Sequence, residues 1–301
     1  MNSVIMDNIA RSYGDVRALD GISVQINGGE LFGFIGPDGA GKTTLFRILT
    51  SLLLPDSGSA TVDGLDVVDD YRKLRRAIGY MPGRFSLYQD LTVEENLQFF
   101  ASVFGTTVDA NYELIRSVFQ YLEPFRHRRA GQLSGGMKQK LALSCALIHR
   151  PSVLFLDEPT TGVDAVSRKE FWEMLEELKA EGITIVVSTP YMDEASLCDR
   201  VALIQDGRLL TVDTPTQIEK SYPKPILSVR SARKYELIKA LRAYPFSSSV
   251  YAFGESAHYT DSRSSVDAVE LQSYLRDQGF TDVTVAQVDP GIEEVFMALM
   301  T

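Results

Sequence analysis

One short glycine-rich segment constrains the fold more than any other part of the chain. Residues 36–43 read Gly-Pro-Asp-Gly-Ala-Gly-Lys-Thr and fit the pattern G-x-x-x-x-G-K-[ST]. The apolar run Leu31–Ile35 before this segment is typical of a buried strand, and the apolar residues after it (Leu45, Ile48, Leu49 and Leu52) have helical spacing. A strand, a glycine-rich turn and a helix in this order predict an α/β fold whose backbone N–H groups surround phosphate.

The residues of this phosphate loop have separate expected roles. Lys42 reaches the β- and γ-phosphates of a bound nucleotide, and the Thr43 hydroxyl group is a ligand for Mg²⁺. We expect ATP to be held by the loop and the residue after it, namely Gly36, Pro37, Asp38, Gly39, Ala40, Gly41, Lys42, Thr43 and Thr44.

Two carboxylates at the end of a second apolar run support this interpretation. Asp157 and Glu158 directly follow Val153–Leu156, which reads as another buried strand. The carboxyl ends of parallel strands are where ligands bind in open α/β sheets. Asp157 is therefore expected to hold Mg²⁺ together with Thr43, and Glu158 to polarise the attacking water as the catalytic base. On their own, two acids at a strand end would be a solvated pair.

Composition excludes several classes of protein. The chain has 301 residues, 30 Lys and Arg against 40 Asp and Glu, and a net charge of −10, which argues against sequence-independent binding of nucleic acid. Its two cysteines, Cys145 and Cys198, are too few for a disulfide scaffold and favour a reducing compartment. The first ten residues lack the pattern of a secretory signal. The longest apolar run, Val295–Met300, has six residues against the roughly 20 of a membrane-spanning helix.

The order of the apolar runs predicts an α/β body with a helical insertion. A third buried strand is expected at Ile183–Val187, so that strands alternate with helices as in a parallel sheet covered on both faces. Strand signals vanish between Thr92 and Arg150, where residues 94–104 and 112–122 have helical patterns. We assign residues 1–217 to this body and residues 84–150, approximately, to the insertion.

A second, smaller domain is expected after a proline-containing linker at residues 214–225. Residues 222–301 then carry the order strand, helix, strand, strand, helix, strand, which fits a small α+β ferredoxin-like unit with one further helix at its end. The expected strands are Ile226–Val229, Val250–Phe253, His258–Thr260 and Asp282–Val288, and the expected helices are Arg233–Ala243, Val266–Gln278 and Ile292–Met300.

A third motif gives the chain a family resemblance. Residues 133–139 read Leu-Ser-Gly-Gly-Met-Lys-Gln, and Ser134 precedes Asp157 by 23 residues. Over residues 1–217 the chain resembles the ATPase subunits of ABC transporters, in which this signature closes on the γ-phosphate of ATP bound to the opposite subunit. Ser134, Gly135 and Gly136 are expected to cap a helix that starts near Met137. The resemblance also implies that Tyr13 stacks on adenine and that Asp164 belongs to the D-loop.

The finer resemblance is to the ATPase subunits of ABC-2 type exporters, the multidrug and daunorubicin-resistance-like branch. It rests on residues 133–140, residues 189–195 and the terminal helix. It implies a motor at the cytoplasmic face of the cell membrane, peripheral to a separate transmembrane permease. It also implies pairing with a second ATP-binding domain, as a homodimer or a heterodimer, and no nucleic-acid partner. Arg84, Leu87 and Tyr88 are the expected contacts with the permease.

The sequence departs from the family pattern at three positions. Gly83 stands where the Q-loop has Gln or Glu, Pro190 stands where the switch histidine is usual, and Asp38 replaces the usual Asn or Ser. Two alternatives therefore stay open beside the hydrolysing motor. One is a weakly hydrolysing, ATP-dependent clamp or regulatory subunit, and the other is a soluble ABC protein acting on ribosomes or DNA. The single ATPase domain, the lack of a long coiled coil and the acidic charge disfavour the second.

Overall fold

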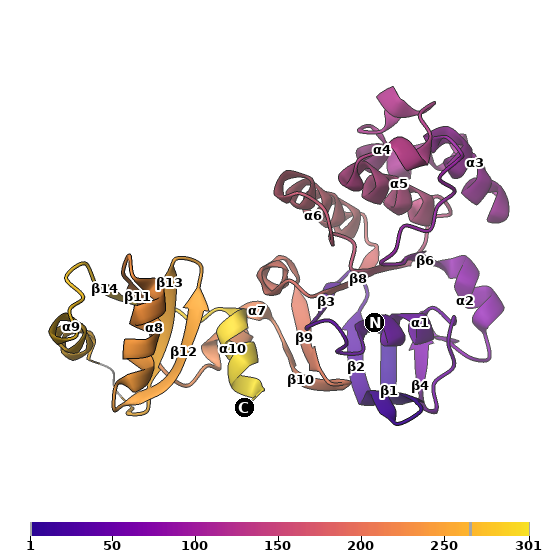
Figure 1. The fold of residues 1–301 in the computed structure, drawn as a ribbon. Helices are drawn as coiled ribbons and strands as arrows, with labels where there is room; N and C mark the ends of the chain where they lie inside the picture. Colours follow the sequence, from indigo (N-terminus) through magenta and orange to yellow (C-terminus); the bar gives the residue numbers. More distant parts are fainter. Residues whose placement is uncertain (1, 265–266, 301) are drawn as a thin grey trace. The chain divides into compact units, whose positions relative to one another are not determined.

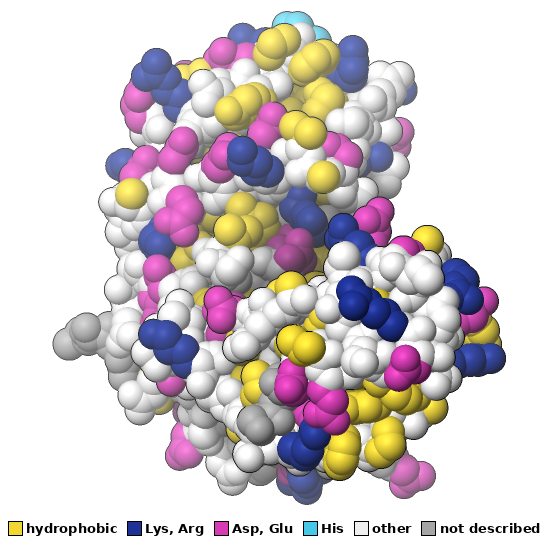
Figure 2. Space-filling view, turned by 90° about the vertical axis from the view of Figure 1, so that its left-hand side faces the viewer, with side chains coloured by type: hydrophobic (Ala, Val, Ile, Leu, Met, Phe, Trp, Pro, Cys, Tyr) yellow, Lys and Arg dark blue, Asp and Glu magenta, His cyan; other side chains and the backbone are white. Residues whose placement is uncertain are grey.

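The computed structural model describes residues 2–264 and 267–300 of the chain (Figure 1). The chain forms two compact units, residues 1–215 and residues 216–301. Each unit has its own hydrophobic core. No helix among the described residues is long and apolar enough to span a bilayer. On the face shown in Figure 2, acidic and basic side chains are interspersed.

A six-stranded sheet forms the centre of the first unit. Its order is β10-β9-β3-β8-β7-β6, and neighbouring strands are parallel except for β10, which runs antiparallel to β9. The strands are β3 (Leu31–Ile35), β6 (Ile78–Met81), β7 (Val153–Asp157), β8 (Thr184–Thr189), β9 (Arg200–Gln205) and β10 (Arg208–Asp213). Every residue of β3, β7 and β8 is buried, as two-sided apolar strands require. The predicted α/β fold is confirmed, although the third expected strand begins one residue later.

A second sheet, which the sequence analysis did not identify, packs against the first through a helix. Its antiparallel order is β2-β1-β4-β5, with β1 (Asn2–Tyr13), β2 (Val16–Asn27), β4 (Ser57–Val62) and β5 (Leu65–Asp66). Helix α1 (Lys42–Leu49) contacts both sheets, and the Phe46 ring meets Phe34 and Phe155 edge to face at 6.0 and 5.9 Å between centroids. Because α1 ends at Leu49, Leu52 lies beyond the helix and is 54% exposed, which corrects its expected place in the helix.

The expected helical insertion is present. Its helices are α3 (Val93–Val103), α4 (Tyr112–Phe119) and α5 (Gly135–Leu147), preceded in the chain by α2 (Tyr71–Ala77) and followed by α6 (Ala165–Ala180). Thr92 begins α3 with a capping box: its hydroxyl accepts from the Glu95 N–H, and the Glu95 carboxylate accepts from the Thr92 N–H. Within the described residues 92–150 the only β pairing is an isolated bridge between Thr92 and Arg129.

The second unit has the strand order of a ferredoxin-like fold. Its antiparallel sheet runs β12-β13-β11-β14, which is the order expected for the sequence strand, helix, strand, strand, helix, strand. The elements are α7 (Pro215–Lys220), β11 (Ile226–Arg230), α8 (Lys234–Ala243), β12 (Ser247–Phe253), β13 (Ser256–Asp261), α9 (Ala268–Asp277), β14 (Thr284–Val288) and α10 (Ile292–Leu299). Val266, the expected start of α9, lies outside the described residues. In α10, Glu294 pairs with His258 of β13 at 2.5 Å.

Candidate functional site

The phosphate loop connects β3 to α1 and depends on glycine at both ends. A Cβ atom at Gly36 would lie 2.1 Å from the Ile204 carbonyl oxygen, and one at Gly41 would lie 2.4 Å from the Ala18 carbonyl oxygen. Gly41 also has φ +102° and Gly39 has φ +83°, which side chains disfavour. The loop therefore needs glycine for close backbone packing as well as for its turn.

The other residues of the predicted nucleotide site lie in the turn between β3 and α1 and in the first turn of α1. The Ala40 N–H donates to the Pro37 carbonyl at 3.2 Å, and the Ala40 side chain is buried. Asp38 is exposed at the loop tip, and Thr44 lies in the first turn of α1.

We expect Gly41→Ala to destabilise the first unit more than Gly39→Ala. Both substitutions force alanine into a left-handed conformation that costs about 1–3 kcal/mol. Only the Gly41 variant also meets a backbone atom, because no heavy atom lies within 4 Å of the Cβ position of Gly39. Denaturant titration of the two variants measures the difference in the free energy of unfolding. Equal losses would contradict the packing requirement.

Lys42 joins the loop to the strand-end carboxylates. Its ammonium group donates to the carbonyls of Gly36 at 2.7 Å and Pro37 at 2.9 Å, and it lies 3.5 Å from the Glu158 carboxylate. The lysine is 3% exposed, so its charged group is shielded from solvent. Its N–H donors face the loop interior and Glu158. When nucleotide binds, phosphate oxygens would replace the loop carbonyls as their acceptors.

Asp157 links three elements at the carboxyl edge of the sheet. Its Oδ1 accepts from the Thr43 hydroxyl at 3.1 Å and from the Ser188 hydroxyl at 2.6 Å, and the aspartate is 2% exposed. Hydroxyl and carboxylate oxygens are the donors that Mg²⁺ prefers, so Thr43 and Asp157 fit this cation. Ser188 was not predicted. It lies directly opposite Asp157 in the parallel pairing of β7 with β8.

Glu158 has an unusual backbone that its neighbours hold in place. Its φ is +51°, a left-handed conformation that costs a residue other than glycine about 1–3 kcal/mol and is typical of functional sites. Its N–H donates to the Ser188 carbonyl at 3.0 Å and approaches the Ser188 hydroxyl at 3.1 Å. This turn directs the carboxylate toward Lys42, and the glutamate side chain remains 23% exposed. It is therefore accessible to water beside the phosphate loop.

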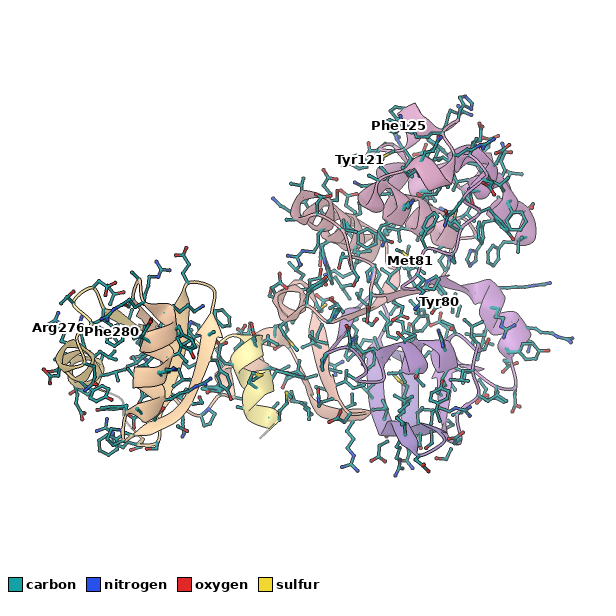
Figure 3. All side chains as sticks on the ribbon, in the orientation of Figure 1. Tyr80, Met81, Tyr121, Phe125, Arg276 and Phe280 are labelled. Carbon is teal, nitrogen blue, oxygen red and sulfur yellow. The ribbon has the colours of Figure 1, made fainter. Side chains whose placement is uncertain are left out.

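Gly83 occupies the place beside these carboxylates that a Q-loop side chain would fill. A Cβ atom there would lie 3.0 Å from the Asp157 carbonyl oxygen and 3.7 Å from the Glu158 Cβ. Tyr80, labelled on β6 in Figure 3, belongs to the same segment, and burial together with the charge of Asp157 raises the pKa of its phenol to about 12. Residue 83 therefore lies beside Asp157 and Glu158 but carries no amide or carboxylate side chain toward them.

Pro190 follows β8 and supplies no donor, because proline has neither an imidazole nor an N–H group. The described chain has its histidines elsewhere. His127 is exposed on the insertion, His149 follows α5 and contacts the Ile78 carbonyl, and His258 lies in the second unit.

The signature and D-loop residues begin two neighbouring helices. Ser134 caps α5 by accepting from the Met137 N–H at 3.3 Å, so the helix starts at Gly135, two residues earlier than expected. Asp164 caps α6 by accepting from two backbone N–H groups, of which that of Ser167 chiefly lowers the pKa of the carboxylate. A Cβ atom at Gly136 would lie 2.6 Å from the Ser167 hydroxyl, so the two helix starts pack closely.

The remaining residues of the predicted site are mostly exposed, in contrast to the buried Lys42 and Asp157. Ser134 and Gly135 are exposed, and their contacts lie within the start of α5 and beside the D-loop. The ring of Tyr13 is 46% exposed at the end of the β1–β2 hairpin, where it pairs with Val16, and Arg11 lies 5.3 Å from its centre. Ala18 of this hairpin is the residue that touches Gly41, so the exposed ring lies at the end of the hairpin nearest the loop.

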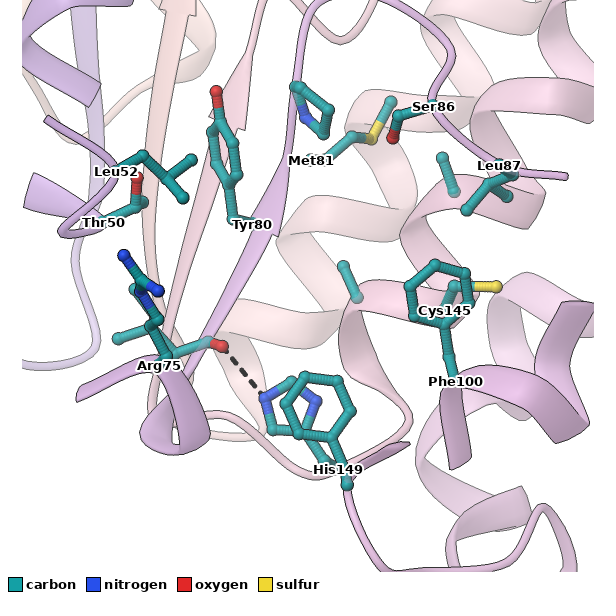
Figure 4. Close-up of a pocket in the computed structure, with 15 residues that line it drawn as sticks. Thr50, Leu52, Arg75, Tyr80, Met81, Ser86, Leu87, Phe100, Cys145 and His149 are labelled. Carbon is teal, nitrogen blue, oxygen red and sulfur yellow. Dashed lines mark hydrogen bonds between the residues drawn. The ribbon is translucent and has the colours of Figure 1, made fainter. Parts of the chain in front are cut away.

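An apolar groove of about 170 Å³ lies between β6 and the helical insertion (Figure 4). The ring of His149, which lines the groove, stacks on the ring of Phe104 with 3.7 Å between the ring centroids. Burial lowers the pKa of this imidazole. The lining residues include Leu52, Tyr80, Met81, Phe100, Phe104 and Cys145. Of the expected permease contacts, Arg84 and Tyr88 are exposed. Leu87 is 8% exposed and lines the groove instead, which corrects its expected place on the surface.

Comparison with known proteins identifies close relatives of the whole chain. The family model described as "ABC transporter" matches residues 19–161. The Nod factor export ATP-binding protein I of Rhizobium sp. (strain N33) is 36% identical over 306 residues, which cover 99% of this chain and 98% of the relative.

Two further comparisons each cover 70% of the chain. The probable multidrug ABC transporter ATP-binding protein YbhF of Escherichia coli (strain K12) is 42% identical over 213 residues, and the aligned region spans 70% of this chain but only 37% of that protein's length. The dimeric, post-hydrolysis structure of the ATP-binding cassette MJ0796 with ADP and Pi superimposes with a TM-score of 0.63 at 26% identity. It covers 70% of this chain and 98% of that one.

Proposed function

This chain belongs to the ABC transporter family of ATPases, and we propose that it is the ATP-hydrolysing motor subunit of an ABC-2 type membrane exporter. In this role it acts at the cytoplasmic face of the cell membrane, peripheral to a separate transmembrane permease. A Nod factor export ATP-binding protein and a probable multidrug ABC transporter ATP-binding protein among its relatives support the exporter assignment.

The contact between the phosphate loop and the strand-end carboxylates carries this proposal. Lys42 lies 3.5 Å from Glu158, and Thr43 donates to Asp157 at 3.1 Å. Lys42 would neutralise the β- and γ-phosphates of ATP, and Glu158 would take a proton from the attacking water. Thr43 and Asp157 would hold Mg²⁺, which supplies charge neutralisation on the phosphate oxygens when bound.

Two of the three departures from the family pattern, Gly83 and Pro190, bear on the rate of hydrolysis rather than on the type of reaction. Losing one contact to the transition state costs on the order of 10²–10³ in rate, so the absence of hydrogen-bonding side chains at Gly83 and Pro190 favours slow turnover. The alternative of a clamp that scarcely hydrolyses ATP has less support, because the base and the phosphate-binding lysine are in contact. We therefore propose an active but slow ATPase.

Docking to a permease is supported by the groove beside β6. Leu52, at its rim, is 54% exposed, and Tyr88 nearby is 50% exposed with its ring against Phe99. Exposed apolar side chains around a groove are typical of a surface that binds a protein segment. We propose that a cytoplasmic helix of the permease packs here.

We expect the tagged chain to recover a polytopic membrane protein from detergent-solubilised membranes. Leu52→Asp should remove most of this partner, because it replaces an apolar contact at the groove rim with a carboxylate that the partner would desolvate. The matched control, Val269→Asp, changes an exposed side chain of α9 in the second unit and should leave recovery unchanged. Recovery with ribosomes instead of a membrane protein, or equal recovery by both variants, would contradict the assignment.

A further inference from the structure

A buried carboxylate to which the sequence analysis assigned no role lies behind the catalytic edge. Glu194, in the short 3₁₀ segment Met192–Leu197, is 1% exposed. Its Oε1 accepts from the Thr160 hydroxyl at 2.7 Å, and its Oε2 accepts from the Thr189 hydroxyl at 2.5 Å. The cation of Arg168 lies farther off, at 3.9 Å. A carboxylate is costly to bury, so the two threonine donors are what make this position tolerable.

The first threonine belongs to the turn that carries the catalytic base. Thr160 follows Glu158 by two residues and is 2% exposed. The turn is closed by the Thr161 N–H, which donates to the Glu158 carbonyl at 3.3 Å, and by the Val163 N–H, which donates to the Thr160 carbonyl at 3.2 Å. A displacement of Thr160 would therefore be transmitted to Glu158.

The second threonine belongs to the strand that meets the phosphate loop. Thr189 is the last residue of β8, and its carbonyl accepts from the Gly36 N–H at 3.2 Å. Its hydroxyl also accepts from the Tyr191 N–H at 3.1 Å, which leaves the hydroxyl proton for Glu194. One carboxylate therefore connects the turn of Glu158 to the start of the phosphate loop.

Glu158 needs such a restraint because its backbone is strained. Ser188 holds its N–H on one side, but the residue after Thr189 is Pro190, which can donate no backbone hydrogen bond. The Glu194 carboxylate instead connects Thr189 to Thr160 through two side-chain hydrogen bonds.

We propose that Glu194 is a positioning residue for ATP hydrolysis, which holds Glu158 in register with the phosphate loop through Thr160 and Thr189. This inference rests on the proposed function, in which Glu158 is the catalytic base. Glu194 touches neither the nucleotide loop nor the reacting atoms, and it acts through the two threonines.

The test compares Thr160→Val with Thr160→Ser in the full-length chain. Valine keeps the shape of threonine and removes the hydroxyl group, whereas serine keeps the hydroxyl group. We expect the valine variant to lower kcat roughly 10- to 100-fold, because small misplacements of a catalytic group have effects of this size. The KM for ATP should stay within about twofold, because ATP is bound by other residues, and serine should restore kcat.

A second pair of variants keeps the test decisive if valine disturbs folding. Glu194→Gln offers only one acceptor oxygen for two hydroxyl groups and should lower kcat in the same way. Its effect and that of Thr160→Val should not add in the double variant, because both disrupt the same link between Thr160 and residue 194. Ser196→Ala, an exposed change on the same segment, is the control and should behave as the wild type.

The outcomes separate this inference from the proposed function. Wild-type turnover no faster than that of Glu158→Gln would overturn the proposed function and the inference with it. Normal wild-type turnover together with an unchanged kcat in Thr160→Val and Glu194→Gln would overturn the inference alone. It would also fail if kcat fell and serine did not restore it, or if the two effects were simply additive.

Discussion

Replacing Glu158 with glutamine is expected to reduce steady-state phosphate release to background while ATP binding persists. The amide keeps the size of the side chain but cannot take a proton from water. General-base catalysis contributes roughly 10²–10⁴ in rate, and turnover should fall by that factor. Neither Gly83 nor Pro190 can take over this role, because neither residue has a side chain that can accept a proton.

The measurement is phosphate release with Mg²⁺ and saturating ATP, together with binding of a fluorescent ATP analogue. Glu255→Gln, a change of an exposed carboxylate in the second unit, is the matched control and should turn over as the wild type does. The decisive comparison is between wild type and Glu158→Gln. If the wild type is no faster than this variant, the chain is not an effective ATPase.

The phosphate loop and its flanking elements could be predicted because their signals are local. Leu31–Ile35 is apolar at nearly every position and forms a strand with these bounds, since a strand buried on both faces has no polar alternation. Lys42 and Thr43 are located by their spacing from Gly36 alone.

The antiparallel sheet of the first unit could not be predicted, because the alternation of apolar and polar residues in its strands is weak and interrupted. Strand β2 alternates buried and exposed residues only in its second half, after Gly21. Its partner β1 pairs with register shifts at several points, which breaks the alternation that a half-buried strand would show. Neither strand contains the continuous apolar run that marks the strands of the central sheet.

Ser188 and the backbone of Glu158 could not be predicted from local sequence for a different reason. Ser188 faces Asp157 only because β7 and β8 pair in parallel with these two residues opposite each other. Asp157 and Ser188 are 31 residues apart in the chain, so their pairing register is a property of the fold, and a serine at a strand end carries no signal of it. The left-handed φ of Glu158 likewise contradicts the local preference of glutamate and persists only because Ser188 and the following turn hold it.

Helix starts were predictable to within about two residues. Ser134 caps α5 as expected, but the helix begins at Gly135, because both glycines adopt helical geometry where α5 packs on Ser167. Ser134 is exposed, which is compatible with the expected contact with ATP on another subunit.

We expect Glu158→Gln to form a dimer in the presence of ATP and Mg²⁺, and we expect the added change Lys42→Ala to abolish it. In a dimer of this kind each ATP lies between one phosphate loop and the signature of the other subunit, and blocked hydrolysis prevents release. A relative of this fold, MJ0796, is dimeric with ADP and Pi. Light scattering during size exclusion should show the mass doubling with ATP and not with ADP.

Lys42→Ala should act through ATP binding rather than through folding. The lysine brings one buried charge to the phosphates, and hydrogen bonds to charged groups contribute about 1.5–3 kcal/mol each, so losing two of them weakens ATP binding by at least about 100-fold. The control Glu158→Gln with Lys239→Ala, in the second unit, should still dimerise. A monomer for Glu158→Gln with ATP would contradict the ATP-bridged dimer. A dimer that survives Lys42→Ala would show instead that association does not depend on nucleotide in the phosphate loop.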